Sequence, residues 1–400
     1  MNIKTTLKLS VAAAALFAIA TPVASPANAA DDTLSSGNKN KLQVSGQVVR
    51  ALWYADDGEH SHLFNTDGNT AHTRVRWVAS GSINENVTAG ATIEHDIGLS
   101  NTTATANFGG STDGGDSNTD TTTFGIRFQY VWVNHKKFGK ISLGNTDGAA
   151  NGNSEATLAG IGLGTPNAQW QGTAINFLET GTTATGSSTG VTVGAVTSNL
   201  DFTSRTDVIR YDTPNFMGFT AAATLSGAGT GEIGARYSGK IGPVNIVATV
   251  GYTEMSSTAG AGGTGVGALG TDTLDYILAG ALALRHDSGL NASVHGGKAP
   301  LDNTGATRGT PNFWAVQGGY QAKIFKVGNT NMRVVYNQSK QINARGSQGE
   351  TWGIDVMQYF NAVGATVSLS YRNYDYQNDR IGDRTIDSVD VFGLQTLFAF

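Results

Sequence analysis

The 400-residue chain has no cysteine and only seven prolines, and no apolar run beyond its first thirty residues is long enough to cross a bilayer as a helix. The lack of cysteine excludes disulfide bonds and thiolate metal sites. The 53 glycines and 39% hydrophobic residues fit a secreted β-solenoid, a loop-rich enzyme or a membrane barrel. Composition alone cannot separate these, so the periodicity of the apolar residues has to decide.

The first thirty residues read as a secretory signal peptide. Lys4 and Lys8 precede an apolar run from Leu9 to Ala20, and small residues at Ala27–Ala29 provide a cleavage site. We expect residues 1–30 to be removed and residues 31–400 to form one domain. Loss of the two lysines changes the formal net charge from −5 to −7, which does not suit nucleic-acid binding. Export without membrane helices leaves a periplasmic, secreted or outer-membrane product.

Apolar and polar residues alternate in segments of about ten residues, the length that crosses a membrane as a tilted strand. In the segment Ala365–Arg372, Ala365, Val367, Leu369 and Tyr371 share one face, and the polar residues share the other. The segments Val244–Thr253 and Trp314–Ile324 behave in the same way. A helix would scatter these residues around its surface.

The separators between these segments alternate between short polar turns and long stretches rich in Gly, Thr, Asn and Asp. Short periplasmic turns and long external loops are typical of an outer-membrane barrel, whereas a soluble sandwich has no reason to keep this rhythm. The pattern predicts an all-β fold, a transmembrane antiparallel β-barrel of about sixteen strands. A hairpin within Gly181–Ser198 would raise the number to eighteen. The expected strands begin near Leu42, Ala71, Thr88, Thr123, Lys140, Thr206, Gly218, Glu232, Val244, Leu274, Leu290, Phe313, Met332, Thr351, Ala365 and Ser388.

The last segment places Phe392, Leu394, Phe398 and Phe400 on one face, interrupted only by Thr396. A strand that closes a barrel and faces lipid gains from such a face, whereas a terminus in solution gains nothing. We therefore interpret these four residues as an assembly signal, with a role in membrane insertion.

Several segments resemble the general Gram-negative porins, and the resemblance runs through most of the mature chain. Residues Val44–Gly58 (VSGQVVRALWYADDG) resemble the family's first strand and loop, and His72–Ile97 (HTRVRWVASGSINENVTAGATIEHDI) its second and third strands. Phe138–Gly148 (FGKISLGNTDG) is similar to the fifth strand, and Arg205–Thr220 (RTDVIRYDTPNFMGFT) to the sixth and seventh. The terminal aromatic resembles the signal that the barrel assembly machinery recognises.

The resemblance implies a homotrimer of barrels in the outer membrane of a Gram-negative bacterium, each with a pore narrowed by the third external loop. By position, the basic and acidic residues of the pore wall would be Arg74, Arg76, Arg127, Arg205, Arg210 and Glu94. On the loop side, Asp147 and Glu155 are the only carboxylates between Thr146 and Asn176. The family's loop signature, a proline and a glutamate followed by an aromatic residue and glycines, is absent there.

Other kinds of site have weaker support. His60, His62 and His72 could bind a metal but lack tight ligand spacing, so exposed loop histidines are favoured. The run Asp113–Asp120 could hold calcium, although a hydrophilic loop is the simpler reading. Arg50 falls on an apolar face, which a bulge, a headgroup-level strand end or a subunit contact would accommodate, and we assign it no pore role. No catalytic motif is present, so neither an enzyme nor a cofactor is expected.

The sequence thus predicts a passive diffusion porin, a water-filled channel for ions and small hydrophilic solutes across the outer membrane. Two alternatives stay open. One is a solute-selective channel with a binding pocket in the same barrel, and the other is a structural or adhesive surface β-protein.

Overall fold

The computed structural model describes residues 33–35, 40–68, 72–98, 123–162, 172–180, 187–227, 229–255, 274–301, 309–378 and 385–400. Within them the protein is almost entirely β-strand, with short helical pieces at α2 (Val193–Val196) and η1 (Asn361–Val363). No helix in the described part is long and apolar enough to cross a membrane. The expected signal peptide and the candidate calcium run Asp113–Asp120 lie outside the described residues.

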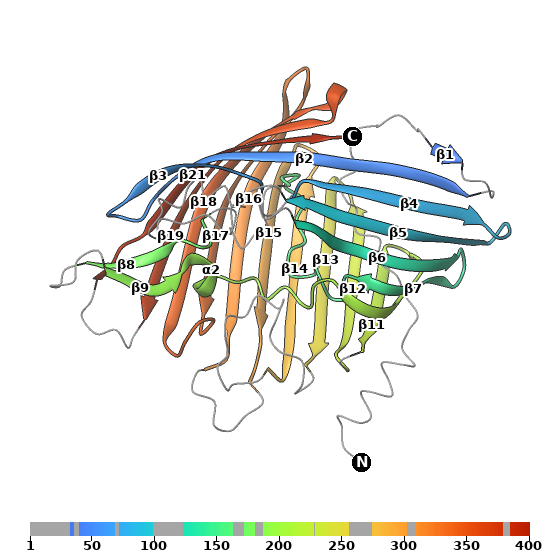
Figure 1. The fold of residues 1–400 in the computed structure, drawn as a ribbon, viewed down its shortest axis with the longest axis horizontal. Helices are drawn as coiled ribbons and strands as arrows, with labels where there is room; N and C mark the ends of the chain where they lie inside the picture. The colour runs from blue at the N-terminus through green and yellow to red at the C-terminus, as the bar shows by residue number, and fades with distance from the viewer. Residues whose placement is uncertain are drawn as a thin grey trace, which may run out of the picture.

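Sixteen strands form the wall of a closed antiparallel barrel (Figure 1). They are β2 (Lys41–Asp56), β4 (Arg74–Ser82), β5 (Val87–Gly98), β6 (Thr123–His135), β7 (Gly139–Thr146), β10 (Thr206–Asp212), β11 (Phe219–Ser226), β12 (Gly231–Ile241), β13 (Val244–Glu254), β14 (Tyr276–His286), β15 (Leu290–Lys298), β16 (Asn312–Phe325), β17 (Gly328–Lys340), β18 (Ser347–Phe360), β19 (Ala365–Asn378) and β21 (Val389–Ala399). Two short strands, β1 (Thr33–Ser35) and β3 (Ser61–Thr66), pair with β2 and extend the sheet. The expected number of sixteen is confirmed.

The barrel closes where the last strand β21 pairs with the first wall strand β2. At this seam Gly46 and Phe400 exchange two backbone hydrogen bonds, of 2.8 and 3.0 Å. The phenyl ring of Phe400 lies over Gly46, where a Cβ would meet it. Closure pairs both edges of each wall strand, which is the condition for a sheet in lipid because no water is present there to satisfy a free edge.

The exposure of the side chains is reversed relative to a soluble protein. On β19, Leu369 on the outer face is 59% exposed, whereas its neighbours Ser368 and Ser370 on the inner face are 1% and 7% exposed. The outer face of β21 carries the predicted row Phe392, Leu394, Phe398 and Phe400, all exposed. Apolar side chains on the outside and polar ones inside are what a bilayer around a polar lumen requires.

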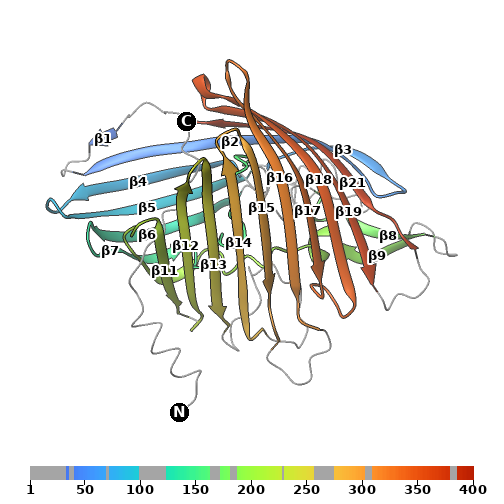
Figure 2. The same cartoon turned by 180° about the vertical axis from the view of Figure 1, so that it is seen from behind.

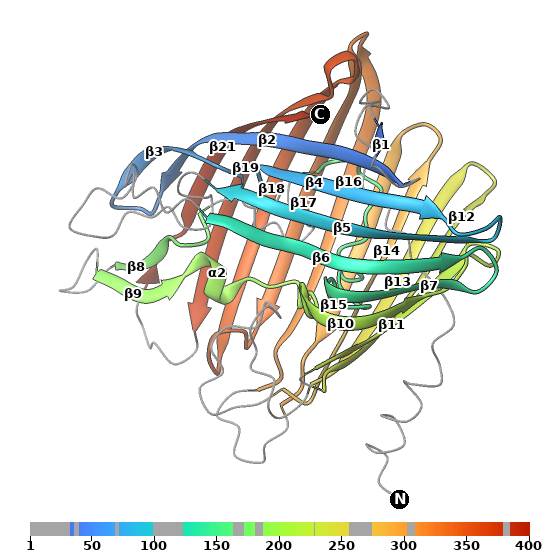
Figure 3. The ribbon, with the colours of Figure 1, turned by 45° about the vertical axis from the view of Figure 1, so that its right-hand side comes forward.

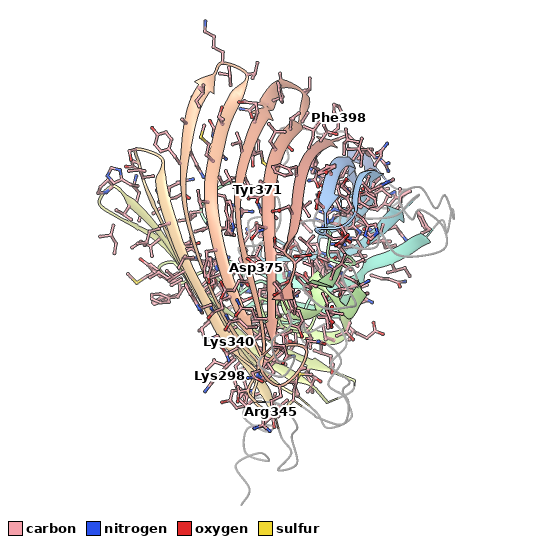
Figure 4. The ribbon with its side chains drawn as sticks, turned by 90° about the vertical axis from the view of Figure 1, so that its left-hand side faces the viewer. Lys298, Lys340, Arg345, Tyr371, Asp375 and Phe398 are labelled. Atoms are coloured by element: carbon pink, nitrogen blue, oxygen red, sulfur yellow. The ribbon has the colours of Figure 1, made fainter. Side chains whose placement is uncertain are left out.

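Aromatic rings of neighbouring strands contact one another on this outer face. Trp352 and Tyr371 pack edge to face with centroids 4.9 Å apart, and Tyr371 also contacts Phe392 at 4.6 Å. Figure 4 looks onto this part of the wall, with Phe398 toward one end, Tyr371 below it and Asp375 further along the same strand as Tyr371.

Arg50 also points outward and donates to Asn65 Oδ1 on the neighbouring strand β3 at 2.8 Å, so this contact holds the side chain without a bulge.

The two walls of the barrel run across each other when the molecule is viewed from the side. Strands β4 to β7 run nearly horizontally at the front in Figure 1, at a large angle to the steep strands β12 to β19 of the far wall, and Figure 2 shows the steep strands from behind. Strongly tilted strands produce this appearance in a closed barrel. The wall strands contain seven to sixteen residues, and differences in tilt and in extension beyond the membrane accommodate this range.

The connection between β7 and β10, residues 147–205, folds into the lumen, and we call it the inward loop. Its outgoing leg is residues 147–162, its lobe comprises the described residues 172–196, and its returning leg is residues 197–205. The lobe contains β8 (Asn176–Thr180), β9 (Ser187–Thr192) and α2, and β8 also pairs with β20 (Thr385–Ile386). Figure 3 shows the chain from β9 through α2 to β10 passing between the two walls.

The predicted strand starts agree with the structure within four residues. The largest differences are at β17 and β18, which begin at Gly328 and Ser347 instead of near Met332 and Thr351. The hairpin within Gly181–Ser198 exists in part as β9, but it belongs to a separate three-stranded sheet and adds no strand to the wall.

Candidate functional site

A cluster of arginines lies on the inner face of β4 and β6 around one buried carboxylate on β5. Glu94 Oε1 accepts a hydrogen bond from Arg127 Nε at 2.8 Å and lies 3.7 Å from Arg74 NH1, and Oε2 binds Arg76 Nε. The Glu94 side chain is only 1% exposed, so water does not stabilise its charge. The three arginine side chains around it do so instead. Arg74 and Arg76 share this face because they are two residues apart in a strand.

Arg127 reaches the lumen through an irregularity in the sheet. The pairing of β5 with β6 shifts at this residue, since Glu94 pairs with Phe128 and His95 with Ile126. Such a bulge gives one strand an extra residue and re-aims its side chain. As a result Arg127 also contacts Asp96 Oδ2 at 3.3 Å.

Two more arginines meet the cluster at the base of the inward loop. Asp147 and Arg205 are the first and last residues of the inward loop, next to the paired Thr146 and Thr206, and Arg205 NH1 lies 4.0 Å from Asp147 Oδ1. Arg210 NH1 donates to the carbonyl oxygens of Asp147 and Gly148, both at 2.9 Å, while its NH2 binds Asp212. Arg210 therefore holds the start of the loop, and Arg205 belongs with the charges that line the passage.

The charged groups of this cluster are Arg74, Arg76, Arg127 and Arg205 together with Glu94, Asp96 and Asp147, which is four positive charges and three negative charges. Burial raises the pKa of Asp147, and the guanidinium groups of Arg205 and Arg210 oppose this rise. Opposite charges across a narrow passage create a transverse field, which orients water and discriminates among solutes by charge and dipole.

The outgoing leg is fastened to the inner wall by hydrogen bonds from one strand after another. Thr249 Oγ1 donates to Asn153 O at 2.6 Å, and His295 Nδ1 lies 2.9 Å from Ser154 O. The remaining contacts are Ala149 with Thr224, Asn153 with Val250, Thr157 with Gln317, Leu158 with Gln321, and Gly160 with Asn331 and Tyr359. The leg thus crosses the wall from β11 to β18 and narrows the lumen from that side.

Glu232 on β12 joins the two legs of the inward loop. Its Oε2 accepts from the backbone N–H of Ala150 on the outgoing leg at 3.1 Å, and its Oε1 accepts from Thr203 N on the returning leg at 2.9 Å. Thr253 Oγ1 donates to the same Oε1 at 3.0 Å. The next inward position on β12 is Gly234, where a Cβ would clash with the carbonyl of Ala149. The loop can therefore lie directly against the wall.

The lobe and the returning leg are held mainly by apolar packing. Ile175, Phe177 and Val193 of the lobe are buried against the inner faces of β2, β3, β19 and β21. Leu200 and Phe202 of the returning leg pack on the opposite wall with Ile277 and Phe313, among other residues. Each of these is less than 5% exposed, so the inward loop has an apolar core inside an otherwise polar lumen.

Asp201 ties the two legs together a second time. Its Oδ1 accepts from Gly152 N at 2.7 Å and its Oδ2 from Asn151 Nδ2 at 3.2 Å. Desolvation raises the pKa of Asp201 to about 7, with a further rise from the nearby Asp147 and Glu232 and a partial opposing effect from the Gly152 N–H. The pKa of Asp201 in the folded protein lies above its ordinary value of 3.8. Protonated Asp201 therefore contributes fully to the stability of the folded state below about pH 4, and this contribution is lost as the pH rises through 7.

We expect the permeability to anions relative to cations to decrease between about pH 6 and pH 8, because ionised Asp201 adds a negative charge beside Asp147. Reversal potentials in a salt gradient at the two pH values would measure this change. In Asp201→Asn the change should be smaller, because no carboxyl group remains at this position to ionise. Equal pH shifts in the wild type and Asp201→Asn would contradict the assignment.

The structure brings together most of the residues that the sequence proposed for the constriction. The arginines, Glu94 and Asp147 meet as expected, whereas Glu155 binds Asn199 Nδ2 within the inward loop. His72 was expected in an exposed loop, but it is half-buried beside Asp96. Sequence reasoning missed Asp96 and Glu232, although the first lies two residues beyond Glu94 on an alternating strand. No cluster of metal-binding side chains occurs in the described part of the chain.

The sequence matches a family model described as Gram-negative porin over residues 11–380. No curated protein matches it. Among solved structures, the chain is similar to an anion-selective porin from Comamonas acidovorans, with 14% identity, a TM-score of 0.56 and coverage of 90% of this chain and 100% of that one. It is also similar to the trimer form of in-vitro folded OmpT from Vibrio cholerae (12% identity, TM-score 0.55, 90% and 99%) and to Salmonella typhi OmpF in complex with daunomycin (14%, 0.54, 92% and 99%).

The solved structures are similar in fold, and the family model covers most of the sequence. Both agree with a closed barrel whose outer face is apolar and whose lumen holds a folded loop. This chain therefore belongs to the Gram-negative porin family and is a diffusion channel of the outer membrane.

Proposed function

We propose that the channel is a passive porin for ions and small hydrophilic solutes, with a constriction between the arginine cluster and the inward loop. The observation that carries the proposal is that the arginine cluster adjoins the base of the inward loop, where Arg205 NH1 lies 4.0 Å from Asp147 Oδ1. Arg74, Arg76 and Arg127 extend the basic side. Charged groups arranged in this way filter solutes without a cofactor, an energy source or a chemical step.

We further propose that the channel prefers anions. The constriction carries four arginines and three carboxylates, an excess of one positive charge. The periplasmic half of the lumen adds Arg236 and Arg285, of which Arg285 binds the neutral Gln321 at 3.1 Å. Within the described residues no carboxylate is paired with Arg236. The net charge of −7 expected for the mature chain gives no guide, because much of it lies outside the lumen.

Conductance across a planar bilayer tests the function. We expect purified protein to form stable pores whose current is proportional to salt concentration, with a reversal potential on the anion side. A protein that forms no conducting pores would overturn the porin proposal and favour the structural or adhesive alternative. Hydrolytic activity that survives loss of conductance would instead favour an enzyme.

We also propose that three copies assemble into a trimer. The supports are the apolar outer face of β4 to β6, where Trp77 packs against His95 and His95 stacks on Phe124, and the trimer form known for the similar OmpT. Electrophoresis without heating, or mass measurement in detergent, would show a species three times the monomer mass. A uniform monomer would contradict this proposal.

For biogenesis, we propose that residues 1–30 direct export and are cleaved, and that the last strand engages the barrel assembly machinery. We expect deletion of Phe400 to lower the amount of inserted barrel more than the conductance of each pore, because the deletion removes the two bonds to Gly46 and the ring that covers it. The lumen contacts stay intact. Heat-modifiable mobility of outer-membrane fractions and single-channel recordings would measure the two quantities.

Phe325→Ala is the matched control for that deletion, because it removes another exposed phenyl ring, 58% exposed against 47% for Phe400, from the end of another strand, β16. Insertion of the Phe400 deletion at the level of this control would show that the terminal residue has no special role in assembly.

A further inference from the structure

Three aromatic side chains face the lumen on β6, where a porin wall is ordinarily polar. Phe128, Tyr130 and Trp132 alternate along the strand, so they share one face. The register places them opposite Glu94, Thr92 and Gly90 of β5, and Glu94 and Thr92 are buried on the inner side of the wall. The outer face of β6 is formed instead by Val131 and Val133, which are 56% and 48% exposed. We call the three rings the lumen aromatic column.

Glycines on the two neighbouring strands make room for the rings. Gly90 lies opposite Trp132, and a Cβ added there would lie 2.5 Å from Cζ2 of the indole. The indole therefore occupies the space that a side chain at Gly90 would fill. Gly144 of β7 pairs with Tyr130 and likewise presents no side chain beside that ring. All three rings are half-buried, so each keeps an exposed surface.

At its Phe128 end, the lumen aromatic column contacts the arginine cluster. The guanidinium carbons of Arg76 and Arg205 lie 5.6 and 5.9 Å from the centre of the Phe128 ring. Tyr130 follows, with its ring centroid 6.2 Å from that of Phe128 in an edge-to-face arrangement. The wall thus presents cationic groups and aromatic faces in succession along one path beside the inward loop.

We propose that the lumen aromatic column and the adjoining arginines form a subsite for aromatic carboxylates. A guanidinium group binds a carboxylate through paired N–H donors, and an aromatic wall binds a ring through stacking and edge contacts. Neither group by itself explains the arrangement, since arginines alone would serve any anion and rings alone any apolar solute. This proposal rests on the proposed function and names a solute class for the same pore.

Block of the single-channel current by added solutes distinguishes the contribution of the arginines from that of the aromatic rings. Benzoate is the probe, cyclohexanecarboxylate keeps the charge and the six-membered ring but lacks aromaticity, and benzyl alcohol keeps the aromatic ring but lacks the charge. In the wild-type protein we expect benzoate to block saturably at a concentration about fivefold or more below that of cyclohexanecarboxylate, with little block by benzyl alcohol.

Variants locate the subsite. Replacing Tyr130 and Trp132 together with leucine should weaken benzoate block about tenfold and leave cyclohexanecarboxylate block nearly unchanged. Arg76→Gln should weaken block by both acids. The matched control replaces Trp352 and Tyr371, an aromatic pair on the lipid side of β18 and β19, with leucine and should leave both blocks as in the wild type.

Equal block of the wild type by benzoate and cyclohexanecarboxylate would overturn the inference while leaving the porin function intact. This comparison uses the wild-type protein alone, so it does not depend on the folding of any variant. Unchanged benzoate block in the Tyr130 and Trp132 variant would also overturn it. A wild-type protein that forms no conducting pores would overturn both the proposed function and the subsite that depends on it.

Discussion

Replacing Arg74 and Arg127 together with alanine is expected to turn the channel from anion-preferring to cation-preferring. The change lowers the constriction from four arginines against three carboxylates to two against three. A unit charge about 4 Å from a passing ion contributes about 1 kcal/mol even in water, a factor of about five in relative permeability. Reversal potentials in a potassium chloride gradient should therefore change sign.

The matched control removes two positive charges away from the passage. Arg50 points outward on β2, and Arg345 is exposed in the turn between β17 and β18, so replacing both with alanine keeps the formal charge of the chain equal to that of the constriction variant. This control should keep the wild-type reversal potential. An unchanged potential in the constriction variant would remove Arg74 and Arg127 from the selectivity site.

Glu232→Ala is expected to release the inward loop and raise the single-channel conductance, with resolvable current steps as the legs leave the wall. The carboxylate accepts hydrogen bonds from both legs, at Ala150 N and Thr203 N, and each charge-assisted bond contributes about 1.5–3 kcal/mol. The barrel wall should persist because its strands are paired by backbone bonds that do not involve this side chain. Recordings at constant voltage would measure both the mean current and its fluctuation.

Glu350→Ala provides the comparison for Glu232→Ala. Glu350 accepts from Tyr336 OH at 2.9 Å and from Gln338 at 3.0 Å on the outer face of β18, so the control removes a hydrogen-bonded carboxylate that touches no part of the loop. Its conductance should equal that of the wild type. If Glu232→Ala conducts with the same mean and noise as this control, the other contacts of the loop are sufficient to hold it and Glu232 does not control the pore.

Much of the barrel could be predicted because the pattern that specifies a strand lies in residues close together in the sequence. Alternation in Ala365–Arg372 reports which side chains face lipid, and the strand structure follows from that pattern alone. The wall arginines Arg74 and Arg76 were identifiable for the same reason, since two residues of equal charge on one strand face must both avoid lipid. Boundaries failed by up to four residues at β17 and β18, where polar residues continue the strands beyond the apolar band.

The sequence by itself therefore determined the barrel, its inner and outer faces and its closing strand, because each depends on residues one or two positions apart. Only the tertiary structure decided the course of the inward loop, the meeting of Arg205 with Asp147 and the anchor at Glu232. These contacts join residues separated by tens of positions, such as Glu232 and Ala150, and depend on which strands the closed wall places opposite one another. The bulge at Arg127 is likewise a property of strand pairing, which no single strand's pattern contains.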